Sequence, residues 1–166
     1  MGKISDAAAS KALKDILGNV CFSKATLAIN AGGAATIKTT GTTTYTVGGI
    51  YYTKAALSAQ SIAIAANYGP VNGTDGYVQP VSSVVYYVVS LDAAGTVYVR
   101  QGSYLNQVLS SQGDLGTGAI PDTLSTQTPI GYFRITTNGA TTFTPGTTLL
   151  DAAGITAAYT DVSLIG

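Results

Sequence analysis

The pattern of hydrophobic and polar positions changes near residue 20. Before that point, apolar residues recur at spacings of three and four, among them Leu13, Ile16 and Leu17, which places them on one face of a helix. Gly18 can end this helix in the left-handed conformation. The pattern therefore predicts a short helix over residues 6–17, whose apolar face packs either on its own domain or on a neighbouring protein.

After residue 20 the pattern alternates with a period of two. Short runs rich in Thr, Ile, Val and Tyr are separated by glycine pairs, which is typical of antiparallel strands joined by tight turns. These runs cover residues 24–31, 34–40, 42–47, 50–54 and 61–66. The turn-forming residues that follow, at 67–80, predict an exposed loop.

The pattern as a whole predicts an all-β fold, an antiparallel β-sandwich or barrel-like domain with a short N-terminal α-helix. A chain of 166 residues is long enough to bury about 70% of the surface that its unfolded form exposes, so it can fold around one core. We expect residues 1–20 to form an N-terminal helical arm and residues 21–166 to form a single antiparallel β domain.

The best-formed strand is predicted at residues 81–91, and it is apolar on both faces. Residues 85, 87, 89 and 91 lie on one face, whereas Val84, Tyr86 and Val88 lie on the other. Such a strand is central in its sheet and is covered on both sides, by its own domain or by another subunit. We therefore expect Val84, Tyr86 and Val88 to form a subunit contact.

This strand is predicted to return through a turn at residues 92–95. The sequence Asp-Ala-Ala-Gly suits a type I turn that Gly95 closes with a positive φ. If Leu91 then opposes Thr96, Tyr87 faces Arg100, and the guanidinium can lie on the aromatic ring.

A second hairpin is predicted at residues 129–146. Asn138-Gly139 is a strong signal for a two-residue type I′ turn. That turn would set Ile135 opposite Thr142 on the core side and would turn Phe143 toward the other face. The segment before this hairpin, residues 110–129, is long for a loop, and its prolines favour an extended arm that either contacts a neighbour or is mobile.

Charge and cysteine content narrow the range of partners. Charged residues make up 10% of the chain, against about 25% in an average domain, and eight basic residues balance eight acidic ones. A neutral surface has no electrostatic field that attracts nucleic acid or a membrane, so neither is expected as a partner. Such a surface also permits close self-association.

Cys21 is the only cysteine and is predicted to be a small core residue. The N-terminal residues lack the continuous apolar region of a secretory signal.

A search for catalytic chemistry finds few candidate groups. The chain has no histidine and no tryptophan, and all of its acidic residues are aspartates, which excludes Ser-His-Asp and Cys-His arrangements. The aspartates stand mostly in turns, where they are expected to bond to the backbone: Asp75, Asp92, Asp114 and Asp122. We expect no enzyme, no cofactor, no catalytic residue and no metal ligand.

The C-terminal half resembles a pattern found in virion structural proteins of tailed bacteriophages. The residues that carry the resemblance lie within 81–162 and include "YYVVSLDAAGTVYVRQGSY" and "IPDTLSTQTPIGYFRITTNGATTFTPG". The resemblance implies a capsid decoration (cement) or head-fibre protein, made in the cytoplasm of a bacterial host and located on the outer surface of the virion. It also implies a β-sandwich that is commonly trimeric.

The resemblance implies that the partner is the major capsid protein of the same virion. We expect the N-terminal helix and the 110–129 segment to contact the shell, through Leu13, Ile16, Leu17, Ile120 and Pro121. The alternative is a phage fibre, tail or receptor-binding adhesion module, which would use exposed tyrosine-rich loops to bind host cells or glycans. A fibre or tail component would occur in few copies in each virion.

Overall fold

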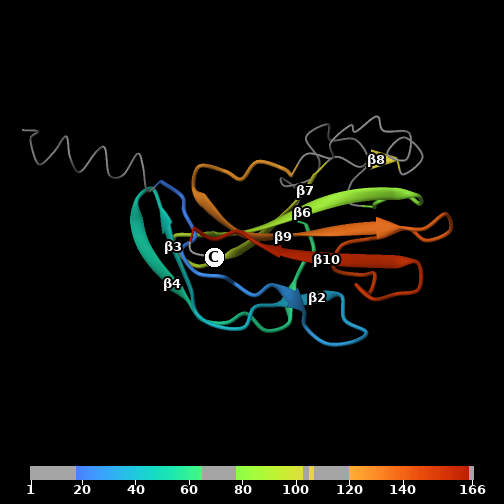
Figure 1. Cartoon of the computed structure of the whole chain (residues 1–166), viewed down its shortest axis with the longest axis horizontal. Coiled ribbons are helices and arrows are strands. Elements are labelled where there is room, and N and C mark those ends of the chain that lie inside the picture. Colours follow the sequence, from blue (N-terminus) through green and yellow to red (C-terminus); the bar gives the residue numbers. More distant parts are fainter. Residues whose placement is uncertain (1–17, 65–77, 103–104, 107–119, 165–166) are drawn as a thin grey trace, which may run out of the picture.

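The computed structural model describes residues 18–64, 78–102, 105–106 and 120–164 (Figure 1). Every regular element in these residues is a β-strand, and every strand pair is antiparallel. The predicted all-β antiparallel fold is therefore confirmed. The helix predicted at residues 6–17 lies outside the described residues.

The largest sheet has five strands and is built by the second half of the chain (Figure 1). Its strand order is β10-β9-β6-β7, and β8 pairs with β6 as well. The strands are β6 (Ser83–Asp92), β7 (Val97–Gln101), β8 (Leu105–Asn106), β9 (Gln127–Thr137) and β10 (Ile155–Asp161). Because β6 has neighbours on both edges, the predicted central position of this strand is confirmed.

The first half of the chain forms two smaller sheets. One has the order β1-β2-β5, with β1 (Ala28–Ile29), β2 (Thr36–Lys38) and β5 (Gln60–Ser61). The other is a hairpin of β3 (Thr43–Val47) and β4 (Ile50–Lys54). Gly48 and Gly49 both have positive φ, as a two-residue type I′ turn requires, so the predicted hairpin around this glycine pair is confirmed. The run predicted at 61–66 is shorter than expected, since no strand extends over residues 62–64.

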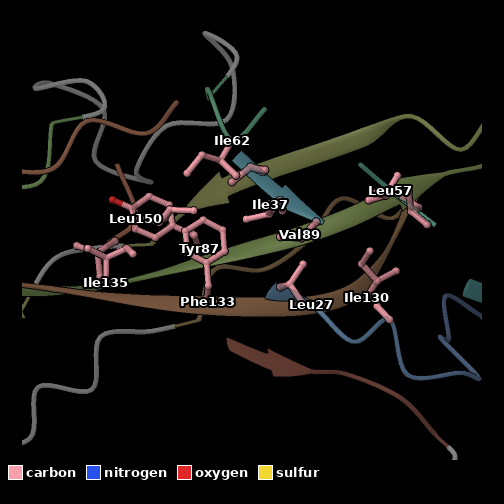
Figure 2. Close-up of a cluster of buried hydrophobic side chains, with 14 of the residues drawn as sticks. Leu27, Ile37, Leu57, Ile62, Tyr87, Val89, Ile130, Phe133, Ile135 and Leu150 are labelled. Atoms are coloured by element: carbon pink, nitrogen blue, oxygen red, sulfur yellow. The ribbon is translucent and has the colours of Figure 1, made fainter. Parts of the chain in front are cut away.

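The hydrophobic core lies between the large sheet and the smaller ones (Figure 2). At its centre the rings of Tyr87 and Phe133 stack at 4.9 Å and 6°, and Phe143 meets Tyr87 edge to face at 5.8 Å. The other side of the core is supplied by aliphatic residues of the smaller sheets and loops: Leu27, Ile37, Leu57, Ile62 and Leu150. The large sheet therefore has one buried face and one face turned away from this core.

A polar side chain is fully buried beside these rings. The loop prediction for residues 67–80 is wrong at Gln79, which has no exposed surface. Its amide nitrogen donates hydrogen bonds to the carbonyls of Ser83 (3.2 Å) and Ile135 (3.0 Å), and its oxygen accepts one from the Tyr87 hydroxyl (3.1 Å). These partners offset the cost of burying the amide, and they fix the start of β6 against β9.

The predicted register of the first hairpin is wrong by one residue. Gly95 has a positive φ, as expected, but Leu91 pairs with Val97 rather than Thr96. The reason is that the Asp92 N–H donates to the Thr96 carbonyl, so Asp92 stays in the ladder and the loop shortens to three residues. Arg100 consequently lies on the face opposite to the Tyr87 ring, and the predicted cation–π contact is not formed.

The predicted hairpin at residues 129–146 is also wrong. β9 pairs with β10, whose register sets Ile135 opposite Ala157, and not with the residues that follow Gly139. Asn138 does not have the positive φ that a type I′ turn needs. Instead, its side-chain oxygen accepts hydrogen bonds from the N–H groups of Ala140 and Thr141. Phe143, expected on the outer face, therefore lies in the core.

The loop prediction for residues 110–129 fails at its C-terminal end. Residues 127–129 belong to β9, where Pro129 lies opposite Ser90, next to a register shift between Val89 and Ser90. Proline lacks an N–H, and strands accommodate it at such irregularities. The remainder of that segment is described only from residue 120 onward.

Candidate functional site

The outer face of the large sheet is the candidate functional surface. Three residues that the sequence placed in a subunit contact, Val84, Tyr86 and Val88, lie side by side on this face of β6. Tyr86 meets Tyr132 of β9 edge to face, with ring centroids 5.9 Å apart and planes at 60°. Val84, Tyr86 and Tyr132 are half-buried, whereas Val88 is only 3% exposed, so Val88 supports its neighbours and offers little contact surface itself.

Two arginines flank the tyrosine pair. Arg134 of β9 lies opposite Tyr86 and is exposed. Arg100 of β7 lies opposite Val88; its Nε atom is buried and has no hydrogen-bond partner. Aromatic rings beside guanidinium groups are enriched in protein interfaces, because both bury large areas and can still pair with polar partners. This face therefore has the chemistry of a protein contact.

The carboxylate at the end of this face is already engaged. Asp92 accepts hydrogen bonds from the N–H groups of Ala94 (2.9 Å) and Thr96 (2.8 Å) and from the Tyr98 hydroxyl (3.1 Å). Partial burial alone would raise the pKa of Asp92, but hydrogen bonds from Thr96, Tyr98 and Ala94 outweigh it and lower the pKa. A shallow depression beside it is lined in part by Val47, Asp92 and Tyr98. A carboxylate held ionised in this way suits turn formation and is poorly suited to donate a proton.

The lowered pKa of Asp92 makes a prediction for acid conditions. A group whose pKa is lower in the folded state contributes stability above its ordinary pKa of 3.8, and that contribution disappears as the pH falls through the folded-state pKa. We expect Asp92→Asn to lower the free energy of unfolding by about 1 kcal/mol at neutral pH, and the difference from the wild type to shrink in acid. Denaturant titrations at several pH values measure this difference; a gap that stays constant down to acid pH would contradict it.

The residues predicted to contact a shell are only partly described. Leu13, Ile16 and Leu17 lie outside the described residues. Ile120 is 47% exposed, whereas Pro121 is buried, so only Ile120 of this pair presents a side chain to a partner. The exposed Leu124 lies four residues further along the chain.

The described residues bring no metal-binding cluster together. Within them, no group of three or more Cys, Asp or Glu side chains could hold an ion. Cys21 is buried, as predicted, and its thiol donates to the Ser23 carbonyl at 3.1 Å. Burial raises the pKa of this thiol, so it is held in the protonated and poorly nucleophilic form.

No helix within the described ranges is long and apolar enough to span a membrane.

The pattern of the sequence does not reveal two features of the surface. Tyr132 lies beside Tyr86, and this contact depends on the register between β6 and β9, which alternation alone does not give. Ile50 and Tyr51 of β4 are large exposed apolar residues, and the strand pattern gave no indication that this strand is at the edge of its sheet.

Comparison with known proteins adds no further constraint. Neither protein-family models, nor curated proteins, nor solved structures yield a match to this chain.

Proposed function

We propose that the protein is a non-enzymatic virion structural protein that binds the outside of a tailed-phage capsid and stabilises it as a decoration protein. In this proposal its partner is the major capsid protein, and its copies associate, as trimers, through the outer face of the large sheet. Binding then depends on extended surfaces and not on a pocket.

One observation carries the proposal. The residues that resemble phage virion proteins, within 81–162, are the same residues that build β6, β7, β9 and β10. The resemblance therefore falls on one continuous structural unit, and the outer face of that unit presents Tyr86, Tyr132 and Arg134. The low charge of the chain, with net charge zero, also favours close packing of many copies.

The copy number of the chain in purified virions tests this proposal. Quantitative mass spectrometry should give a copy number of the same order as that of the major capsid protein, because a decoration protein occupies sites repeated over the whole shell. A handful of copies in each virion would instead favour the fibre or tail alternative. Absence of the chain from virions would overturn the proposal.

A further inference from the structure

The β3–β4 hairpin presents an open edge. β3 is flanked on one side by β4 and on the other by residues 18–22, where the Thr46 N–H donates to the Val20 carbonyl and the Phe22 N–H to the Thr44 carbonyl. Within the described part of the chain, β4 pairs with β3 alone (Figure 1). Among the residues that the structure describes, the far side of β4 is therefore an edge, and no described strand pairs with its backbone groups.

The hydrogen bonds of β3 fix which groups of β4 point outward. The backbone groups of Thr44 and Thr46 form hydrogen bonds with residues 18–22, so they point away from β4. The other residues of β3 therefore form the hydrogen bonds to β4, and their partners in β4 are Ile50, Tyr52 and Lys54. The remaining residues of β4, Tyr51 and Thr53, direct their N–H and C=O groups away from β3. These four groups form a template for one additional antiparallel strand.

The side chains of β4 leave this edge unprotected. Ile50 is 55% exposed and Tyr51 60% exposed, and the Tyr51 ring lies 6.3 Å from that of Phe22. Edge strands are usually guarded by charged side chains, especially lysine. The one lysine of β4, Lys54, lies over the β6–β7 turn: a Cβ atom at Gly95 would be 3.1 Å from its Cδ. An apolar, unguarded edge of this kind is suited to pairing with another strand.

We propose that β4 pairs antiparallel with β4 of a second copy of this chain, with Tyr52 opposite the partner's Tyr52. In this register the N–H of Tyr51 donates to the carbonyl of the partner's Thr53, and the carbonyl of Tyr51 accepts from the N–H of the partner's Thr53. Thr53 forms the same two hydrogen bonds with the partner's Tyr51. All of the outward groups of Tyr51 and Thr53 in both copies are then satisfied. Shifting the register by two residues leaves some of them unpaired.

The same register is favourable for the side chains. It places Ile50 opposite the partner's Lys54, so the two lysines lie at opposite ends of the paired strands and do not repel each other. Since both strands are identical, the contact is isologous and closes as a dimer. In this register the outward N–H groups of one copy meet the outward C=O groups of the other, and β4 carries no charge besides Lys54; both features favour a second copy over an unrelated strand. This inference does not rest on the proposed function.

Thr53→Pro removes the outward N–H without disturbing the pairing of β4 with β3. Proline is tolerated at an edge position whose N–H faces away from the sheet. Sedimentation velocity and native mass spectrometry of the full chain should detect a concentration-dependent dimer for the wild type, or the corresponding pairing of trimers if the outer face also associates. Association of Thr53→Pro should be at least about tenfold weaker, since two intermolecular hydrogen bonds are lost in each dimer. The matched control is Thr53→Ala, which keeps the N–H and should associate as the wild type does.

Cysteine cross-linking tests the register. Tyr52→Cys would bring two identical non-hydrogen-bonded positions to about 4.5 Å between Cα atoms, which is within the range of a disulfide. Under mild oxidation this variant should give a covalent dimer. Thr53→Cys is the control: the two substituted positions would be diagonal neighbours at about 7–8 Å, too far apart for a disulfide without backbone movement.

Several outcomes decide the matter. A wild type that stays monomeric at high micromolar concentration would overturn the proposal, and so would a dimer that Thr53→Pro leaves intact. Circular dichroism confirms that each variant is folded. Tyr86→Ala, on the outer face of the large sheet, separates the two proposals: if it alone abolishes association, the contact belongs to the outer face and the β4 pairing is refuted.

Discussion

Phe133→Ala should lower the free energy of unfolding by about 3–5 kcal/mol, the range for a fully buried aromatic side chain. Phe133 has no exposed surface and stacks on Tyr87 at 4.9 Å, and Tyr159 of β10 lies 6.2 Å away on its other side. Its removal would leave a cavity between two sheets that have little freedom to close it. Chemical denaturation should give a lower midpoint with an unchanged dependence on denaturant concentration.

The matched control for this variant is Tyr132→Ala. Tyr132 is the preceding residue on β9, is of similar size and faces outward, where it is half-buried. Its loss should cost no more than about 1–2 kcal/mol, because less area is buried and solvent can fill the space. Equal losses from the two variants would contradict the assignment of these residues to opposite faces.

Gln79→Leu should destabilise the fold by about 2–4 kcal/mol, although leucine is the more hydrophobic residue. Gln79 is fully buried, and its amide satisfies the Tyr87 hydroxyl and the carbonyls of Ser83 and Ile135. Leucine would leave the buried Tyr87 hydroxyl without a partner, and it would remove the N–H donor from which each carbonyl accepts a hydrogen bond. Thermal or urea unfolding measures the loss.

A double-mutant cycle with Tyr87→Phe isolates the central hydrogen bond. Tyr87→Phe alone should cost about 1–2 kcal/mol, because it leaves the Gln79 oxygen without its donor. When both residues are replaced, no polar group of this pair remains unsatisfied, so the double variant should lose less than the sum of the single losses. Strict additivity would show that the Tyr87–Gln79 hydrogen bond contributes nothing.

The alternation of residues predicted the strands with the clearest faces. The placement of Val85, Tyr87 and Val89 together on one face is confirmed, since all three are buried. It was predictable because a strand has a fixed period of two and needs no partner to define its faces. The turn at Gly48-Gly49 was equally predictable, since glycine tolerates the positive φ that the turn requires.

Pairing was harder to predict than the strands themselves. Asp92 was assigned to the turn, but its backbone N–H extends the ladder by one residue, and that single residue moved Arg100 to the opposite face from Tyr87. The Asn138-Gly139 signal was misleading because Asn138 forms a side-chain turn instead, and β9 finds its partner beyond Gly154. Both errors come from local bonds that compete with the expected hairpin geometry.

The candidate surfaces were predictable only in part. The outward position of Tyr86 followed from alternation, whereas its contact with Tyr132 needed the register of β6 against β9. The open edge of β4 depends on which strands are neighbours, and strand order is a property of the whole fold that no local pattern in residues 50–54 contains.

The strand order also has a consequence for synthesis of the chain on the ribosome. β10 is translated after every other described strand, yet it completes the large sheet, and Asp161 at its end accepts the Leu27 N–H across 134 positions of sequence. Until β10 has left the exit tunnel, one edge of β9 has no neighbour, and Phe133 lacks the ring of Tyr159. The large sheet can therefore be completed only after β10 has been translated. Until then the edge of β9 stays unpaired, and the nascent chain must avoid aggregation through it.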